Sequence, residues 1–402
     1  NHLKCNEENI EYKMYNLERH NYSINTEAII NINVTDDLCY SIFTSGTTGK
    51  PKGTLISHHN IYNFIRTNKE YNNKNNKIGY CCYDSMMTNL NIKNVLAITN
   101  FSFDASFVEI FGSLIHGLKL ILTDEIINED IDLLSHYMIE NEVEYIQMTP
   151  SRLKLLMENN LFRISLKQIK IICLGGEALS LELCKNIKEI CNCKIFNEYG
   201  PTECAVGCTF KEINCNEENK LTIGKPQCNY KIYILDKYKK PVPIGVEGEI
   251  YIGGYGVGKG YLNRPELTKE KFIENPFNYD NDEHNKIMYR TGDLGKWTDE
   301  GEIEYLGRID FQVKINGQRV ELGEIESKVL EIPEIQQCVV IDQKKENGEK
   351  YLVCYYISNG NEEIISNKNI RKYLSEKLPR YMVPNYYIRI NELPLSSTGK
   401  LN

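Results

Sequence analysis

Apolar runs of strand length alternate with helix-start signals through the first half of the chain. The runs LCYSIFT at 38–44, EYIQM at 144–148 and IKIICLGG at 169–176 each predict a strand, because they are short and rich in large apolar side chains. Pro150 suits the first position of a helix, and Ser180 suits a helix cap. Strands that alternate with amphipathic helices predict a mostly parallel sheet covered by helices.

The pattern changes after Lys231. Short strands such as KIYILD and GEIYIGG lie between glycine and proline turns, which predicts an antiparallel or barrel-like unit. After Asp310 the order strand, helix, strand, strand, helix, strand predicts a small α+β domain. The predicted fold class is therefore α/β: multi-layer, mostly parallel sheets with helices, a barrel-like β unit, and a smaller α+β carboxy-terminal domain. We place the two domains at 1–309 and 310–402.

The charge balance limits the kinds of partner. Lys and Arg number 47 against 55 Asp and Glu, for a net charge of −8, whereas a nucleic acid favours a basic face. No apolar run reaches the roughly 18 residues that span a bilayer, so we expect neither nucleic acid nor membrane as partner. The chain starts at Asn1 with no signal-peptide pattern, so we expect a cytoplasmic piece of a longer protein.

The cysteines do not form a metal-binding pattern. There are 14, scattered along the chain, and Cys191 and Cys193 are too close for the common metal spacings. We expect reduced structural thiols of a cytosolic protein, with a metal or disulfide role as the alternative.

The stretch TSGTTGKPKG at 44–53 combines glycines, hydroxyls and two lysines directly after a predicted strand. It does not match the P-loop pattern, because two residues instead of four separate its glycine from Gly-Lys and Pro51 follows. Backbone N–H groups, hydroxyls and ammonium groups can still bind a phosphate with another geometry. A flexible turn is the alternative for such a loop taken alone.

The chain resembles the adenylate-forming superfamily, and within it the adenylation domains of nonribosomal peptide synthetases. Motifs in the family's order carry the resemblance over nearly the whole chain. They are TSGTTGKPKG at 44–53, NEYGPTE at 197–203, GEIYIGGYGVGKGYLNRPELT at 248–268, YRTGDL at 289–294, GRIDFQVKINGQRVELGEIE at 307–326, LPRYMVP at 378–384 and SSTGK at 396–400. Most of the family's part upstream of the phosphate loop is absent, so 1–309 resembles a partial large domain.

The resemblance implies a reaction in two steps. An amino acid carboxylate attacks the α-phosphorus of ATP, with Mg²⁺ present, and pyrophosphate leaves. The acyl group then passes to the phosphopantetheine thiol of a carrier-protein domain, expected in the same full-length polypeptide; a condensation domain is a further partner that the resemblance allows. The carboxylate is already ionised at neutral pH, so catalysis is mostly positioning and charge stabilisation.

The resemblance also assigns nucleotide-binding and catalytic positions. Those expected at the phosphates are Thr44, Ser45, Gly46, Thr47, Thr48, Gly49 and Lys52. Those expected around the nucleoside and the α-phosphate are Glu177, Asn197, Tyr199, Gly200, Thr202, Asp293 and Arg308, with Tyr199 near the adenine and the last two at the ribose. Glu203 would bind Mg²⁺, Lys400 would reach the α-phosphate, and Asp310 would be the hinge of the small domain. Alternatives remain: surface lysines, a structural Asp293–Arg308 pair and a solvent-exposed Lys400.

Asp104 in NFSFDASFVEIF matches the aspartate that pairs with the substrate α-ammonium in amino-acid-activating members. An amine is the natural counter-ion of a buried carboxylate, but Asp104 could instead cap the helix that starts near Phe107. The pocket walls implied by the resemblance are Ala105, Val108, Gln147, Cys173, Gly175, Glu198, Val206 and Gly207. Because Gln147 and Glu198 could bind an amide, a hydroxyl or a cation, we expect a polar proteinogenic-type α-amino acid.

Other functions stay open at this point. An aminoadipate-reductase-type domain, an alanyl carrier-protein ligase and an acyl-CoA ligase use the same chemistry. A non-catalytic relic that binds a nucleotide or a partner belongs to another class. A relic has no need to keep Glu203, Asp293, Arg308 and Lys400 together, which disfavours it.

Overall fold

The computed structural model describes residues 32–44, 51–65, 83–216, 220–309, 312–315, 318–345, 350–358 and 366–392. The chain divides into two compact units, Asn1–Val34 and Thr35–Asn402, and every element below lies in the second. Within the described part of the chain, no helix is both long enough and apolar enough to cross a membrane.

A mostly parallel sheet forms the centre of the helical part of the molecule. Its strand order is β4-β3-β5-β6-β7-β8-β9, with parallel pairing from β4 to β7 and antiparallel pairing at β8 and β9. The strands are β3 (Asn94–Ala97), β4 (Lys119–Leu122), β5 (Tyr145–Met148), β6 (Ile171–Gly175), β7 (Lys194–Tyr199), β8 (Thr209–Glu212) and β9 (Lys225–Pro226). The predicted parallel sheet is confirmed.

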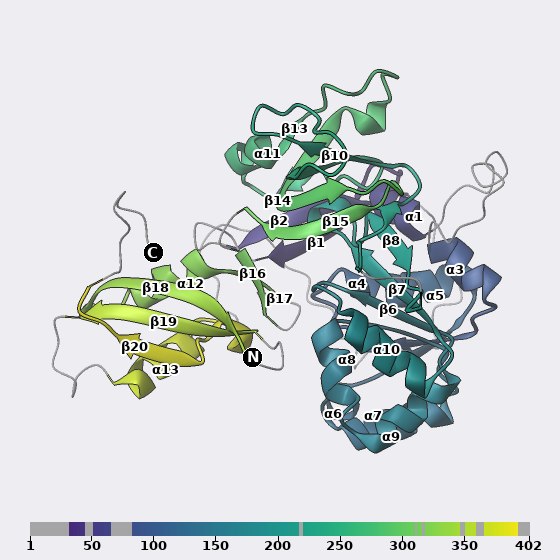
Figure 1. Cartoon of the computed structure of the whole chain (residues 1–402), viewed down its shortest axis with the longest axis horizontal. Helices are drawn as coiled ribbons and strands as arrows, with labels where there is room; N and C mark the ends of the chain where they lie inside the picture. The colour runs from purple at the N-terminus through teal and green to yellow at the C-terminus, as the bar shows by residue number, and fades with distance from the viewer. Residues whose placement is uncertain are drawn as a thin grey trace. The chain divides into compact units, whose positions relative to one another are not determined.

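Helices bury both faces of this sheet. Neighbouring residues of a strand point to opposite faces, so Ile171 and Ile172 belong to two different apolar clusters. Helices gather on one side in Figure 1: α6 (Glu125–Glu129), α7 (Ile131–Glu140), α8 (Pro150–Leu156), α9 (Asn160–Ser165) and α10 (Leu181–Ile190). The other cluster takes side chains from α1 (His58–Ile65), α3 (Tyr83–Asn89), α4 (Ala105–Phe107) and the π-helical η2 (Val108–Gly112), which continues into α5 (Ser113–His116). Pro150 and Ser180 start their helices as predicted.

Two antiparallel sheets lie beside the parallel one. The first confirms the predicted change of pattern near Lys231. The second contains the strand predicted at 38–44, which was expected among the parallel strands but pairs antiparallel with residues 52–57. One has the order β10-β11-β14-β13, with β15 also paired to β14; the other has the order β1-β2-β12. Their strands are β1 (Leu38–Thr44), β2 (Lys52–Ser57), β10 (Tyr230–Leu235), β11 (Gly248–Gly254), β12 (Gly260–Tyr261), β13 (Phe272–Glu274), β14 (Ile287–Trp297) and β15 (Ile303–Arg308), with α11 (Pro265–Lys271) between β12 and β13. The sequence did not predict β2, which pairs with β1 so that Thr44 lies opposite Lys52.

The carboxy-terminal segment has its own apolar core. It comprises a hairpin of β16 (Gln312–Ile315) and β17 (Gln318–Glu321), then α12 (Leu322–Val329), β18 (Ile335–Lys344), β19 (Lys350–Ser358), α13 (Asn367–Ser375) and β20 (Tyr386–Arg389). The strands β18, β19 and β20 form one sheet, in which β19 and β20 are parallel. The predicted element order is confirmed, with β17 added. The domain boundary at 309/310 stays a prediction.

Candidate active site

The candidate pocket lies where neighbouring strands of the parallel sheet end. Gln147 pairs with Cys173 across β5 and β6, and Gly175 pairs with Glu198 across β6 and β7. The carboxyl ends of parallel strands meet at one edge of a sheet, where open α/β folds place their ligands. The sheet register therefore brings these four predicted pocket residues together.

A hydrogen-bonded chain of buried side chains connects three of these predicted pocket residues. The Tyr145 hydroxyl donates to Gln147 Oε1 over 3.1 Å, and Gln147 Nε2 donates to Glu198 Oε2 over 3.0 Å. The Cys173 thiol lies 3.8 Å from the same carboxylate oxygen. Each member is buried, so the chain fixes the Glu198 carboxyl group. The sequence did not predict that Tyr145 belongs to this hydrogen-bonded chain.

The second oxygen of Glu198 has a different environment. Glu198 Oε1 is buried and has no hydrogen-bond partner among the described residues. A side chain on Gly207 would place its Cβ 2.2 Å from Glu198 Oε1, so glycine leaves this oxygen its space. Burial, and secondarily the charge of Asp104, raise the pKa of Glu198 to about 8. A buried polar atom without a hydrogen bond destabilises the fold. This oxygen is therefore a candidate for a hydrogen bond with a ligand.

Asp104 lies at the start of α4 and is only partly exposed. Burial raises the pKa of its carboxyl group, while hydrogen bonds from the Thr202 side chain and the Ala105 N–H oppose that shift. The Asp104 side chain makes no capping hydrogen bond, and its backbone is already helical, so the helix-cap alternative is wrong. In this structure Thr202 is a partner of Asp104, and its place at the α-phosphate stays a prediction.

Backbone strain adjoins the remaining pocket positions. Ala205 and Val206 have φ values of 54° and 74°, in the left-handed region that a β-branched residue rarely adopts. A Cβ on Gly200 would lie 2.4 Å from the Val206 carbonyl oxygen, so this turn needs glycine. Val206 packs in the same apolar cluster as Val108. Such strain persists only when the surrounding packing imposes it.

The end of the β1–β2 hairpin holds a buried ion pair. Lys52 Nζ lies 3.2 Å from Glu203 Oε1, and both side chains are almost completely buried. The Tyr261 hydroxyl donates to Glu203 Oε1 over 2.7 Å, and Lys52 Nζ donates to the Tyr261 hydroxyl over 3.3 Å. The surface-lysine alternative is therefore wrong for Lys52. The sequence did not single out Tyr261, although it lies within the quoted motif at 248–268.

A second buried carboxylate, Asp293 of β14, is contacted by side chains of β7 and β15. Asp293 Oδ2 accepts from the Tyr199 hydroxyl over 2.6 Å, and Asp293 Oδ1 accepts from Arg308 over 2.8 Å and from Tyr305 over 3.3 Å. The Asp293–Arg308 pair named as the structural alternative is thus present. A carboxylate has about four acceptor positions, so these three bonds leave room for about one ligand hydroxyl. Burial and the Asp293 charge raise the pKa of Tyr199 well above its ordinary value.

Two other predicted nucleotide positions bind their own chain. Glu177 accepts hydrogen bonds from the backbone N–H and the hydroxyl of Ser151, each over 3.0 Å, at the start of α8. Asn197 Nδ2 donates to the Thr222 carbonyl oxygen over 2.8 Å. These contacts position β7 and α8 around the pocket. Other predicted residues lie outside the described residues: Ser45, Gly46, Thr47, Thr48, Gly49, Asp310 and Lys400.

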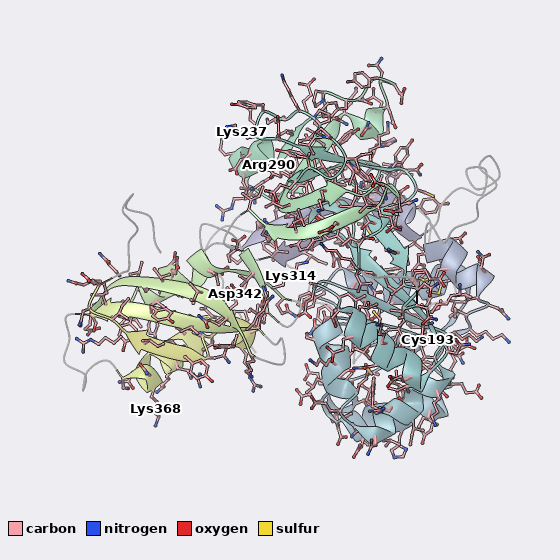
Figure 2. The ribbon with its side chains drawn as sticks, viewed as in Figure 1. Cys193, Lys237, Arg290, Lys314, Asp342 and Lys368 are labelled. Carbon is pink, nitrogen blue, oxygen red and sulfur yellow. The ribbon has the colours of Figure 1, made fainter. Side chains whose placement is uncertain are left out.

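Cys193, labelled in Figure 2, comes directly before β7. Its Sγ lies 3.2 Å from that of Cys191, and both thiols are buried and unoxidised. The hydrogen-bonding contact with the Cys193 thiol lowers the pKa of Cys191 to about 7. In the described segments, no three His, Cys, Asp or Glu side chains are placed to hold a metal ion.

Comparisons with known families match both parts of the chain. The description "AMP-binding enzyme" matches residues 4–262, and "AMP-binding enzyme C-terminal domain" matches residues 324–400. A mycosubtilin synthase of Bacillus subtilis is 39% identical over 387 residues, which cover 95% of this chain and 14% of that protein. Tyrocidine synthase 1 of Brevibacillus parabrevis is 38% identical over 368 residues, covering 91% and 31% respectively. The chain thus spans less than a third of either relative.

Solved structures share the fold. An NRPS protein containing adenylation and PCP domains, bound to a vinylsulfonamide inhibitor, has a TM-score of 0.78 and 25% identity, covering 96% of this chain and 62% of that one. A four-domain nonribosomal peptide synthetase bound to AMP and glycine has a TM-score of 0.57 and 31% identity, covering 91% and 25% respectively. The predicted α/β fold class is confirmed.

Proposed function

The chain belongs to the AMP-binding enzyme family, and from this premise we propose that it activates an α-amino acid with ATP for nonribosomal peptide synthesis. The amino acid carboxylate attacks the α-phosphorus, pyrophosphate leaves, and an aminoacyl-adenylate forms. The similarity to peptide synthetases supports this function over an acyl-CoA ligase or a nucleotide-binding relic.

The observation that carries the choice of an amino acid is the environment of Asp104. Its carboxyl group is withdrawn from water, which raises its pKa, and it accepts a hydrogen bond from Thr202 beside Glu203. An ammonium group of the substrate supplies the positive charge that keeps such a carboxylate ionised. A substrate held there by its amine has its carboxylate within the same pocket, next to the nucleotide.

The nucleotide is held by charges on both sides of this pocket. Thr44 and Lys52, at facing positions of the β1–β2 hairpin, bind the outer phosphates. Asp293, held by Tyr199 and Arg308, accepts a ribose hydroxyl. The attacking carboxylate needs no base, so these groups accelerate the reaction by orientation and by electrostatic stabilisation.

The residues present fit a Mg²⁺ ion that arrives with the nucleotide. Glu203 supplies a fully buried carboxylate, and Mg²⁺ commonly takes one or two carboxylates together with phosphate oxygens. When bound, the ion offsets negative charge on the phosphates as pyrophosphate leaves. The Glu203 carboxylate would then face the metal ion, and the Lys52 ammonium group would face the phosphate oxygens.

The substrate side chain meets Glu198 and Gln147. Gln147 is already hydrogen-bonded to Tyr145 and Glu198. We therefore expect the substrate side chain to contact the buried Glu198 Oε1, which has no partner among the described residues. A substrate side chain with a hydrogen-bonding group at its end satisfies this atom, whereas a purely apolar one leaves it unsatisfied. The substrate is therefore a polar α-amino acid.

The second half-reaction needs a partner. The adenylate is attacked by the phosphopantetheine thiol of a carrier domain, and AMP leaves. In this proposal a carrier domain and a condensation domain belong to the longer protein, and the similarity to a protein containing adenylation and PCP domains supports the carrier domain.

ATP–pyrophosphate exchange over a panel of the proteinogenic amino acids tests the proposal. We expect exchange to depend on the amino acid and to favour those with a polar, hydrogen-bonding side chain. Exchange with large apolar amino acids alone contradicts the polar pocket. Exchange driven by fatty acids and by no amino acid contradicts the function itself.

A further inference from the structure

Tyr261 is held rigidly at the edge of the candidate phosphate site. It ends β12, where it pairs with Thr54 of β2, and its N–H donates to the Thr268 hydroxyl over 2.9 Å. Its ring meets that of Phe272 edge to face, with centroids 5.4 Å apart. The side chain is almost fully buried, so both the backbone and the ring fix the direction of the hydroxyl group.

That hydroxyl lies between two buried charges. It donates to Glu203 Oε1 over 2.7 Å and accepts from Lys52 Nζ over 3.3 Å, while Lys52 Nζ lies 3.2 Å from the same carboxylate oxygen. Each charge is therefore neutralised by the other in this structure, with the phenol as a neutral third member. Buried charges need such partners at all times, because an unpaired one is costly.

Binding of magnesium and ATP changes what the two charges can pair with. Phosphate oxygens would compete for Lys52, and the metal ion would compete for Glu203. The Tyr261 hydroxyl is neutral, so phosphate or metal attracts it less strongly than the two charges, and it also lies 3.4 Å from the Tyr289 hydroxyl. It can therefore keep its hydrogen bond to Glu203 while the ion pair separates.

We propose that Tyr261 is a positioning residue that holds the Glu203 carboxylate in its metal-binding orientation while Lys52 passes from Glu203 to the phosphates. This inference rests on the proposed function, in which Glu203 takes the metal ion. Hydrogen bonds to a ligating carboxylate orient it, and their loss typically lowers metal affinity about 10–100-fold.

The test is Tyr261→Phe, which keeps the ring and removes the hydroxyl group. Tyr230→Phe is the matched control, because Tyr230 is buried in the same apolar cluster and its hydroxyl donates to the Cys204 carbonyl oxygen over 3.0 Å. Calorimetry measures ATP binding without amino acid, and so without turnover, over a range of Mg²⁺ concentrations. Thermal unfolding of each variant accompanies the titrations.

We expect Tyr261→Phe to raise the Mg²⁺ concentration at half-maximal stimulation of ATP binding by about 10-fold or more. Its affinity for ATP without Mg²⁺ should equal that of the wild-type protein, and Tyr230→Phe should match the wild type throughout. Thr268→Val, which removes the acceptor of the Tyr261 N–H, should shift the Mg²⁺ response in the same direction by a smaller factor.

Glu203→Gln separates the two proposals. If Glu203→Gln removes the Mg²⁺ response and Tyr261→Phe leaves it unchanged, the positioning role is overturned and the metal role of Glu203 stands. If Glu203→Gln keeps the wild-type response, the metal role in the proposed function is wrong, and the inference about Tyr261 falls with it. Equal losses in Tyr261→Phe and Tyr230→Phe indicate general loosening of the core and also overturn the inference.

Discussion

Replacing Glu198 by glutamine should change how the stability of the protein depends on pH. Burial, and secondarily the charge of Asp104, raise the pKa of Glu198 from 4.5 to about 8 in the folded chain. Between these values the folded chain keeps a proton that the unfolded chain has released. The contribution of Glu198 to the free energy of unfolding is therefore fully present below the unfolded pKa. It is lost as the pH rises from the unfolded to the folded pKa. Glutamine stays neutral and removes this dependence.

The magnitude follows from the same two pKa values. One pH unit in the window changes the unfolding equilibrium tenfold, so the distance from 4.5 to pH 7 corresponds to about 3 kcal/mol. The loss levels off above about pH 8. Burial also raises the pKa of Glu109 to about 7, but this contribution is common to both proteins and cancels in their difference.

Urea unfolding at several pH values between 4 and 8.5 measures this difference. We expect the free energies of unfolding of wild type and Glu198→Gln to diverge with rising pH, with the variant the more stable by about 3 kcal/mol near pH 7. Glu182→Gln removes a carboxylate from the exposed first turn of α10 and serves as the control. Parallel curves for wild type and Glu198→Gln refute the argument, because Glu198 would then be ionised in the folded chain.

Three further substitutions test the assigned roles. Asp104→Ala should abolish amino-acid-dependent exchange, with about 3–5 kcal/mol at stake, and leave ATP binding measured by calorimetry unchanged; near-normal exchange removes Asp104 from the ammonium role. Tyr199→Phe loses the donor to Asp293 and should weaken ATP binding by about 1.5–3 kcal/mol, whereas unchanged binding would separate Asp293 from the nucleotide. Lys400→Ala should slow adenylate formation roughly 10²–10³-fold and spare thiol transfer from a supplied aminoacyl-adenylate. Comparable losses in both half-reactions contradict that role.

The sequence predicted the elements whose apolar pattern is local and long enough to read. The parallel strands predicted at 144–148 and 169–176 and the carboxy-terminal order belong to this class. It missed β2, since KGTLIS continues a glycine-rich loop and becomes a strand only by pairing with β1 and β12. The short strand β17 depends in the same way on its partner β16.

The candidate site was predictable in its residues but not in their pairing. The motifs named Glu203 and Tyr199, yet their partners Tyr261 and Asp293 are 58 and 94 positions away in the chain. Only the fold brings such groups together, and no local rule selects them. The left-handed backbone of Val206 was unpredictable for another reason, since a β-branched residue disfavours it.

The requirement for the substrate amine tests the central claim most directly. Mass spectrometry can detect the adenylate formed from ATP and the preferred amino acid, and from the same acid without its α-amino group. We predict abundant aminoacyl-adenylate from the amino acid and at least a roughly 100-fold lower yield from the analogue, because Asp104 then lacks its counter-ion. Equal yields of the two adenylates would contradict the account of this chain as an amino-acid-activating enzyme.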